Sequence, residues 1–329
     1  MTSDGEPTKR PIVFWIKLAV RAIIIALVVW GIWRTVANAK GEFADAGFQW
    51  TSLRFSWLFL AMVFYIVGMF PSCIFWWRVL QAMGQRPTLL ETLRAFYIGH
   101  LGKYAPGKAF VVVIRTALIR SSRVNTTVAV ASVFVETLTM MAVGAVVAAI
   151  ILGTLFRGQV WFLGMAVFLA ICAGVPTLPP LFRRALRILQ VHRANPDIDK
   201  AIDGLDARVM GVGWITISIG WCFFGLSMWA TMKSLPPEMA QAGLEQFPLL
   251  TASVALAMVA GFLSLLPGGI GVRELVVIPL LSPVFGQVAA ILSAVLLRIA
   301  WMAAEVVVSI VLYLASPSPE QSESHIGRP

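Results

Sequence analysis

Long apolar runs separated by short polar segments dominate this chain. Six of the runs are about as long as the roughly 20 residues that an α-helix needs to cross the hydrocarbon core of a bilayer. The pattern therefore predicts an all-α, polytopic integral membrane protein. Its six full spans are expected at residues 16–36, 57–79, 128–153, 160–182, 212–232 and 288–314.

Two further apolar segments, 88–120 and 247–281, are each too long for one span, and a Pro-Gly pair interrupts each near its middle. The pairs begin at Pro106 and Pro267. Each follows an earlier proline by the same distance, since 106 − 87 = 19 and 267 − 248 = 19, which suggests an internal duplication. Broken backbone at bilayer depth is stable only where protein buries it or where it lines a watery cavity. We therefore expect the functional site at these two breaks.

The distribution of Lys and Arg predicts the topology through the positive-inside rule. The N-terminal segment and residues 183–208 are basic, and we expect both in the cytoplasm. Segment 88–120 then begins and ends on the cytoplasmic side, whereas segment 247–281 enters from the outer face. A half segment of about 15 residues is short for a full crossing. This favours two re-entrant helical hairpins over the alternative, in which each segment crosses the membrane twice.

The predicted topology is an inverted repeat, with span, hairpin and span in residues 57–153 and again, in the opposite orientation, in residues 212–314. Many transporters share this plan, and their substrate sites lie where broken helices meet near the midplane. Residues 1–56 are expected to form a tail and the first helix, residues 154–211 a connecting span and basic cytoplasmic segment, and residues 315–329 a disordered tail. Both termini are predicted to be cytoplasmic, in a plasma (inner) membrane.

Composition and charge narrow the function classes. Of the 329 residues 59% are hydrophobic and 13% charged, and the net charge is +10. The basic residues are scattered beside the spans, so nucleic-acid binding is not expected, whereas basic loops attract anionic lipid headgroups. The three cysteines lie inside apolar spans without CxxC spacing and are expected to be small core residues. No metal site and no cofactor follow from these features.

The first break carries groups that suit an anion. Lys103 and Lys108 flank the Pro-Gly turn, and a charge at the bilayer centre costs at least ~2.5 kcal/mol unless it finds a partner or a polar ligand. The glycines Gly102 and Gly107 leave backbone amides unobstructed, and Pro106 fixes the bend. Amides, a helix N-terminus and two ammonium groups together favour a phosphate. The alternative is that both lysines snorkel to the membrane surface.

Residues 102–108 also fit the G-x-x-x-x-G-K pattern of a nucleotide-binding loop. The next residue, Ala109, lacks the hydroxyl that would bind Mg²⁺, and no predicted strand precedes the loop. We therefore expect no ATP site here.

Further charges lie within the predicted spans. Arg298 and Glu305 are seven residues apart and share one face of the last helix. Glu136 follows Pro106 by 136 − 106 = 30 residues, and Arg298 follows Pro267 by 298 − 267 = 31, so the two halves carry charges at comparable depth. Glu136 and Arg298 are candidates either for a pair that lines the pathway across the repeat interface or for a static internal salt bridge. His100 is expected to be a hydrogen-bonded structural residue rather than a tuned functional one.

The run from Gly102 to Lys108, with Arg115 downstream, and the run from Leu266 to Glu274 resemble the two signature stretches of the lysylphosphatidylglycerol synthase transmembrane family, also called the flippase-like domain family. The resemblance covers roughly residues 15–314. It implies a membrane unit that moves lipids, including aminoacylated phosphatidylglycerol, between leaflets; related members are linked to glycan assembly on polyprenyl carriers. Only a short tail follows residue 314, so we expect the membrane half alone, without the aminoacyl-transferase domain.

These features together predict a lipid flippase-like protein, not an enzyme, that translocates an anionic phospholipid or lipid-linked substrate. Its partners would be membrane lipids and, as a further expectation, a lipid-synthesising enzyme. The alternatives are a membrane subunit or enzyme of polyprenyl-phosphate-linked glycan assembly, and a small-ion transporter. The candidate substrate-binding residues are Lys103, Tyr104, Pro106, Gly107, Lys108, Arg115, Glu136, Pro267, Gly268, Gly269, Gly271, Arg273, Glu274, Arg298 and Glu305.

Overall fold

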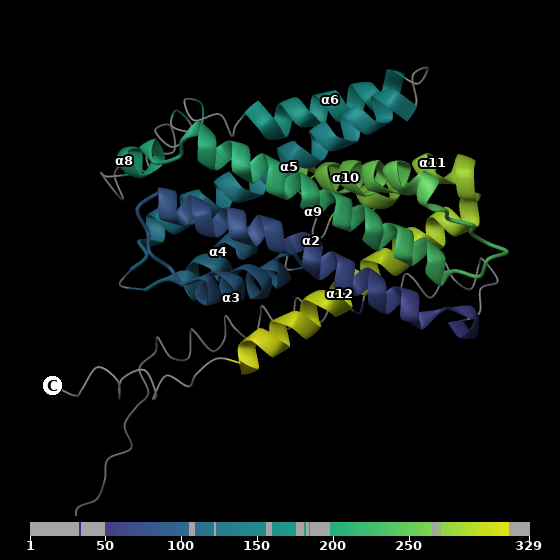
Figure 1. Ribbon diagram of the computed structural model, residues 1–329, viewed down its shortest axis with the longest axis horizontal. Coiled ribbons are helices and arrows are strands. Elements are labelled where there is room, and N and C mark those ends of the chain that lie inside the picture. The colour runs from purple at the N-terminus through teal and green to yellow at the C-terminus, as the bar shows by residue number, and fades with distance from the viewer. Residues whose placement is uncertain are drawn as a thin grey trace, which may run out of the picture.

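Helices make up the regular secondary structure of the part of the chain that the structure describes (Figure 1). The computed structural model describes residues 33, 50–104, 109–121, 123–155, 160–175, 181, 184, 198–264, 269 and 271–315. Within these residues, five helical stretches are long and apolar enough to cross a membrane, namely Phe55–Ala82, Thr126–Leu155, Ala207–Ser234, Leu244–Leu263 and Gln287–Leu314. The prediction of an all-α integral membrane protein is therefore confirmed.

Four of the six predicted spans coincide with long helices. They are α2 (Phe55–Ala82), α5 (Thr126–Leu155), α9 (Ala207–Ser234) and α12 (Gln287–Leu314). The predicted span 160–182 begins as α6 (Val160–Gly174), and most of its remainder lies outside the described residues. The predicted first span, apart from Trp33, and residues 316–329 of the predicted tail also lie outside them.

The first interrupted segment contains two short helices, α3 (Leu89–His100) and α4 (Ala109–Ile119), which pack against each other. A 3-10 turn, η2 (Leu101–Tyr104), directly follows α3. Thr88 starts α3 because its hydroxyl accepts a hydrogen bond from the Glu91 backbone, while the Glu91 side chain accepts one from the Thr88 backbone. The helices contain 12 and 11 residues. Each is therefore about 17 to 18 Å long, well short of the ~30 Å hydrocarbon core.

The second interrupted segment has a longer first half. The turn η5 (Leu244–Gln246) leads into α10 (Phe247–Leu263), and α11 (Val272–Phe285) follows the break. Gly269 and Gly271 have φ angles of 67° and 82°, a conformation that strongly favours glycine and lets the chain reverse direction here. The stretch through η5 and α10 has 20 residues and is long enough to cross a membrane. The predicted half length of about 15 residues therefore fits the first segment better than the second.

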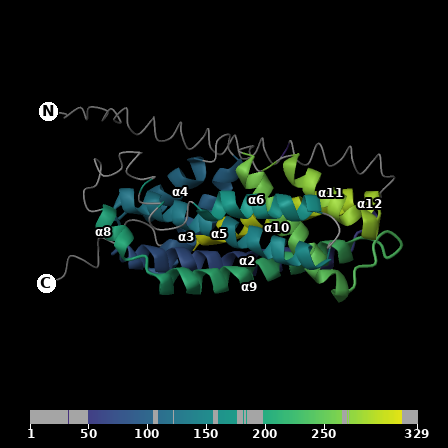
Figure 2. The ribbon, with the colours of Figure 1, turned by 90° about the horizontal axis from the view of Figure 1, so that it is seen from above.

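Residues 57–153 and 212–314, which we call the first and the second repeat, contact each other through several pairs of helices. The counterparts α2 and α9 lie side by side and run in opposite directions, and the pairs α3/α4 and α10/α11 occupy opposite ends of the molecule (Figures 1 and 2). The first helix of each broken segment packs against the last long helix of the other repeat: α3 packs against α12, and α10 packs against α5. At the two breaks, Tyr104 of the first segment lies within electrostatic range of Arg273 of the second.

Basic side chains gather at one end of the bundle. There, the backbone amide of Arg86 donates to the carbonyl of Arg123, and the short helix α8 (Ile198–Asp203) lies beside the end of α2 (Figure 1). Within the described part of residues 183–208, Ile202 and Leu205 are buried in the core. The basic residues at this end are Arg78, Arg86, Arg120, Arg123, Lys200 and Arg208.

Candidate functional site

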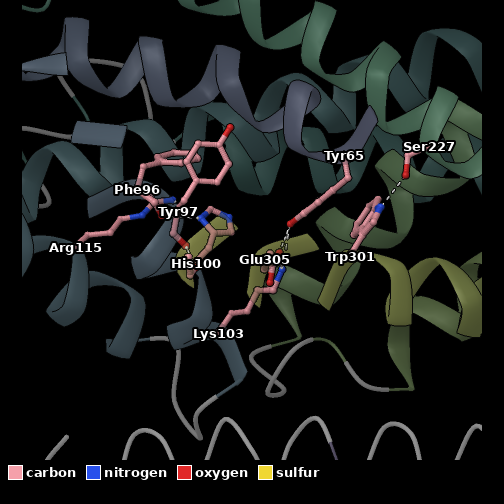
Figure 3. Close-up of polar contacts among 10 residues, drawn as sticks. Tyr65, Phe96, Tyr97, His100, Lys103, Arg115, Ser227, Trp301 and Glu305 are labelled. Carbon is pink, nitrogen blue, oxygen red and sulfur yellow. Dashed lines mark hydrogen bonds and ion pairs between the residues drawn. The ribbon is translucent and has the colours of Figure 1, made fainter. Parts of the chain in front are cut away.

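The intramembrane charges form two groups. We call Lys103, Arg273, Glu274, Arg298 and Glu305 the tip cluster, because they lie at or beside the two helix breaks. We call His100, Arg115 and Glu136 the sealed cluster. Figure 3 shows His100 and Arg115 together, apart from Lys103 and Glu305.

The sealed cluster is a completely buried ion pair with a histidine beside it. One terminal guanidinium nitrogen of Arg115 donates to Glu136 Oε2 at 2.6 Å, and each side chain is 1% exposed. The Thr137 hydroxyl donates to the same carboxylate oxygen at 3.1 Å, whereas Glu136 Oε1 is buried without a hydrogen-bond partner. The other terminal nitrogen of Arg115 lies 2.8 Å from His100 Nδ1. The expectation that His100 is hydrogen-bonded is confirmed.

Aromatic rings and a glycine enclose the Arg115 guanidinium. Its central carbon lies 4.2 Å from the centre of the Phe96 ring and 5.3 Å from the Trp76 ring, within the range of cation–π attraction. A Cβ at Gly99 would collide with Arg115 Cγ. The Trp76 indole is held in place because it donates to Ser132 Oγ at 2.9 Å. This packing excludes water and holds the arginine in one orientation.

The tip cluster joins the two repeats through Glu305. Lys103, from η2, and Tyr65, from α2, both donate to Glu305 Oε1 on α12 (Figure 3). Glu305 is 2% exposed and Lys103 20%. The Lys103 ammonium also lies 5.2 Å from the centre of the Tyr104 ring, and Tyr104 is buried. The ammonium of the first hairpin is therefore bound to a carboxylate of the second repeat.

Stacked aromatic rings continue this network. Tyr65 stacks on Trp301 with ring centres 4.5 Å apart, and the Trp301 indole donates to Ser227 Oγ at 2.9 Å. Ser227 in turn donates to the carbonyl of Ala61 at 2.8 Å. The network thus connects α12 to α2 and α9, so that Glu305 and Trp301 are held from both repeats.

A small cavity lies beside the second break. It has a volume of about 30 Å³, and its polar lining residues are Arg273, Glu274 and Arg298, with Trp301 at its wall. A terminal nitrogen of Arg298 donates to Glu274 Oε1 at 3.1 Å, and the two side chains are 12% and 22% exposed. Arg273 Nε and Glu274 Oε2 are buried without hydrogen-bond partners. Lys103 lies within electrostatic range of both arginines. The cavity therefore holds polar groups that are not fully satisfied.

The structure brings together only part of the predicted site. Arg115 and Glu136 do not line the cavity. The hypothesis that Glu136 pairs with Arg298 is wrong, because each forms its ion pair within its own repeat. The reason is local, since each break places a charged half-helix against the long span that follows it in sequence. The predicted residues Pro106, Gly107, Lys108, Pro267 and Gly268 lie outside the described residues.

Sequence reasoning missed Tyr65, Trp301 and Ser227. A tyrosine hydroxyl inside an apolar span was the available signal, because the chain has only four tyrosines and a buried hydroxyl requires a partner. Trp301 carried no such signal within a tryptophan-rich membrane protein. The part of the chain that the structure describes contains no group of three or more His, Cys, Asp or Glu arranged to hold a metal ion.

Comparison with known proteins agrees with the fold. The model of a family described as the lysylphosphatidylglycerol synthase TM region matches residues 15–309. This range contains both repeats except for the last residues of α12, and it includes every member of the two charge clusters. A search of curated proteins finds no match. Because the match spans most of the 329 residues, the chain belongs to the lysylphosphatidylglycerol synthase transmembrane-region family.

Proposed function

We propose that this protein translocates an anionic lipid between the leaflets of the membrane and binds the headgroup at the tip cluster. The observation that carries the proposal is the meeting of three cations, Lys103, Arg273 and Arg298, with two carboxylates, Glu274 and Glu305, where the broken helices approach each other. The charges of these five residues sum to +1. Intramembrane charges of this kind usually mark a substrate or ion pathway, and the family supports a lipid-related function.

The hydrogen-bonding capacity of the cluster suits a phosphate oxygen. Arg273 Nε is buried without a partner, and it lies beside the ion pair of Glu274 and Arg298. Arginine presents several N–H donors in a rigid fork that matches phosphate geometry. A headgroup phosphate accepting from Arg273 and Arg298 would satisfy the orphaned donor and would compete with Glu274 for Arg298.

The volume of the cavity distinguishes an open from a closed state of the proposed transporter. A volume of about 30 Å³ holds about one water molecule, whereas sites for organic ligands are typically ~300 to 1,000 Å³. In this proposal the structure is therefore a closed state, and a headgroup enters when the hairpins part. The ion pair of Lys103 with Glu305 bridges the repeats, so it would break as one repeat rocks against the other.

The orientation in the membrane follows from the basic end of the bundle. We place the end with Arg86, Arg123 and Lys200 in the cytoplasm of a plasma membrane, according to the positive-inside rule. The hairpin of α3 and α4 then dips in from the cytoplasmic side, and the segment of α10 and α11 enters from outside. Single cysteines at Tyr104 and Gly269 test this topology. Maleimide labelling from opposite faces supports it, and labelling of both from the same face contradicts it.

Lipid translocation by purified protein in vesicles tests the function. The full chain is reconstituted into phosphatidylcholine vesicles that contain phosphatidylglycerol and a trace of its fluorescent, headgroup-retaining analogue, and dithionite quenching follows the analogue between leaflets. Folded wild-type protein is expected to accelerate the exchange. Arg273→Gln should slow it by ~10- to 100-fold, because hydrogen bonds to charged groups contribute about 1.5 to 3 kcal/mol.

A matched control is Arg123→Gln, which removes a 51% exposed arginine far from the tip cluster and should leave exchange unchanged. Folded protein that moves neither phosphatidylglycerol nor any other anionic lipid would refute the proposed function. Equal rates for Arg273→Gln and wild type would refute the assignment of the site.

A further inference from the structure

The sealed cluster contains a buried ion pair, Arg115 and Glu136, that has no role in the proposed headgroup binding. Glu136 lies 136 − 126 = 10 residues from the start of α5, or ~15 Å along the helix. Its carboxylate has one oxygen occupied twice, by Arg115 and Thr137, and one oxygen without any partner. Burying a carboxylate is costly unless it is fully hydrogen-bonded. The free oxygen is therefore a position where a proton can be held.

The contact between Arg115 and His100 determines which ring nitrogen of His100 carries the proton. A guanidinium only donates, so a distance of 2.8 Å requires His100 Nδ1 to accept, and the ring proton must then reside on Nε2. The carbonyl of Phe96, 3.4 Å from the same nitrogen, would instead need Nδ1 to donate. The shorter distance favours the neutral, accepting form. A second proton on His100 would place two cations in contact and would break this hydrogen bond.

We infer that the sealed cluster binds and releases a proton, and that it couples lipid translocation to a proton gradient across the membrane. This inference rests on the proposed function. A proton from water on one side adds to Glu136 Oε1, forms an O–H bond and neutralises the carboxylate. The same proton later leaves to water on the other side and restores the ion pair with Arg115. No electron transfer and no other reactant is involved.

Neutralising Glu136 changes the balance around Arg115. The guanidinium keeps its charge in a dry site but loses the carboxylate that compensates for it, which is costly for a buried cation. The neutral form of Glu136 therefore favours a conformation in which α4 moves and Arg115 reaches water or another partner. The charged form favours the packed arrangement described above.

The first hairpin transmits this change to the tip cluster. His100 is the last residue of α3, and Lys103 follows it by three residues within η2. On the other side of the break, Arg115 lies on α4, which starts at Ala109. Both arms of the hairpin are thus tied to the sealed cluster, while its tip is bound to Glu305. A hairpin with two arrangements that both sites bias is the physical requirement for coupling.

Each element packed around the sealed cluster contributes defined groups. Cys73 on α2 and Lys103 on η2 lie within electrostatic range of it. The helices α6, α8, α9 and α10 also pack against α5. Of these, α8 carries three charges, α9 carries charges only near its ends, and α10 and α6 carry none. The titratable and charged groups on the helices around the cluster are Tyr65, Cys73, Arg78, Glu91, Arg94, Tyr97, His100, Lys103, Arg115, Cys172, Asp199, Lys200, Asp203, Arg208, Cys222 and Lys233. Proton binding is therefore decided mainly between Glu136, Arg115 and His100.

The vesicle assay with the fluorescent phosphatidylglycerol analogue tests the inference when a pH gradient is imposed and the membrane potential is clamped with valinomycin and potassium. One proton coupled to one lipid shifts the leaflet ratio of the analogue by up to about tenfold per pH unit, since one pH unit corresponds to 1.36 kcal/mol. For wild-type protein we expect a several-fold shift, together with proton flux reported by pyranine inside the vesicles. Glu136→Gln should equilibrate the analogue without responding to the gradient.

The matched control is Glu91→Gln, which removes a 37% exposed carboxylate of the same hairpin and should keep the response to the gradient. A wild-type leaflet ratio that ignores the gradient while the lipid still moves overturns the coupling and leaves the proposed function standing. If no lipid moves at all, both fall.

A second measurement covers the case in which Glu136→Gln does not fold. Infrared difference spectra of wild-type protein after a pH jump should show a carboxylic-acid carbonyl band. Glu136→Asp keeps a carboxyl group at this position, so it should shift that band. An unshifted band, or none, would overturn the assignment.

Discussion

Each repeat contains an ion pair between the half-helix after the break and the following long helix, and the two pairs differ in exposure and in the order of their charges. In the first repeat Arg115 follows the break and Glu136 lies on the long span; in the second, Glu274 follows the break and Arg298 lies on the long span. Both side chains of the first pair are 1% exposed. In the second pair Arg298 is 12% and Glu274 22% exposed, and both line a cavity. An ion pair between a half-helix and the long helix that follows it is thus sealed in one half of the chain and lies beside a cavity in the other.

In both hairpins a glycine packs against an arginine side chain. In the first hairpin Gly99 accommodates Arg115, and in the second Gly261 and Gly269 accommodate Arg273. In the first repeat this arginine is also the ion-paired one. In the second repeat, among the described residues, Glu274 pairs with Arg298 instead, and Arg273 Nε has no hydrogen-bond partner. The second repeat therefore offers one more cation, which is the group that an anionic ligand needs.

Breaking the sealed pair should have the largest effect on stability. Arg115→Ala leaves Glu136 buried and uncompensated, and we expect the free energy of unfolding to fall by ~3 to 5 kcal/mol. Thermal unfolding in detergent micelles measures this loss. The double variant Arg115→Met with Glu136→Leu should recover much of it, because it removes both charges and keeps the packing. An equal loss in the double variant would show that packing, not charge, is the cause.

Replacing Gly99 of the first hairpin by alanine should lower the free energy of unfolding by a somewhat smaller amount. Gly99→Ala drives a methyl group into Arg115 Cγ, with the Arg115 backbone nitrogen at 3.3 Å, and overpacking of this kind costs ~1 to 3 kcal/mol. In Gly261→Ala the methyl group meets flexible side-chain atoms of Arg273, the nearest at 2.9 Å, and the Gly269 Cα only at 3.4 Å, so this variant should lose less stability while slowing lipid exchange. Gly164→Ala, which has no atom within 4 Å, serves as the control. The comparison fails if Gly261→Ala is the more destabilising.

Breaking the accessible pair should affect transport more than stability. Arg298→Gln removes a charge that is less deeply buried than Arg115, and the glutamine amide can still donate to Glu274, so the free energy of unfolding should fall by less than in Arg115→Ala. Exchange of the phosphatidylglycerol analogue should fall by ~10-fold or more, because a donor to the headgroup is lost. Unfolding and exchange are measured on the same preparation. Normal exchange in a folded Arg298→Gln protein would exclude this pair from the headgroup site.

The smallest effect is expected at the surface of the first hairpin. Arg123 donates to Glu91 at 2.8 Å, and the two side chains are 51% and 37% exposed. Arg123→Gln should change the unfolding free energy by less than ~1 kcal/mol, because solvent screens exposed pairs. Thermal unfolding should place it close to wild type. A loss comparable to that of Arg115→Ala would mean that burial does not distinguish these pairs.

The location of the site could be predicted from the sequence, but the partners within it could not. The Pro-Gly breaks and the nearby Lys103, Arg273 and Glu274 were visible as charges beside interruptions of apolar runs. The spacing of Glu136 and Arg298 from the breaks indicated equal depth in the two halves and left their pairing open. Depth follows from position along a helix, whereas pairing depends on how the helices face each other, which spacing does not specify.

The sequence by itself determined the class of the protein, its four confirmed long spans and the interruption of the two remaining segments. Apolar length and helix-breaking residues are local properties, so the chain displays them directly. Only the tertiary structure decided that Lys103 binds Glu305, 202 residues away, that Tyr65 joins them, and that Arg115 is sealed beneath Phe96. Those contacts arise from the packing of helices distant in sequence, and burial and partner choice are properties of that packing alone.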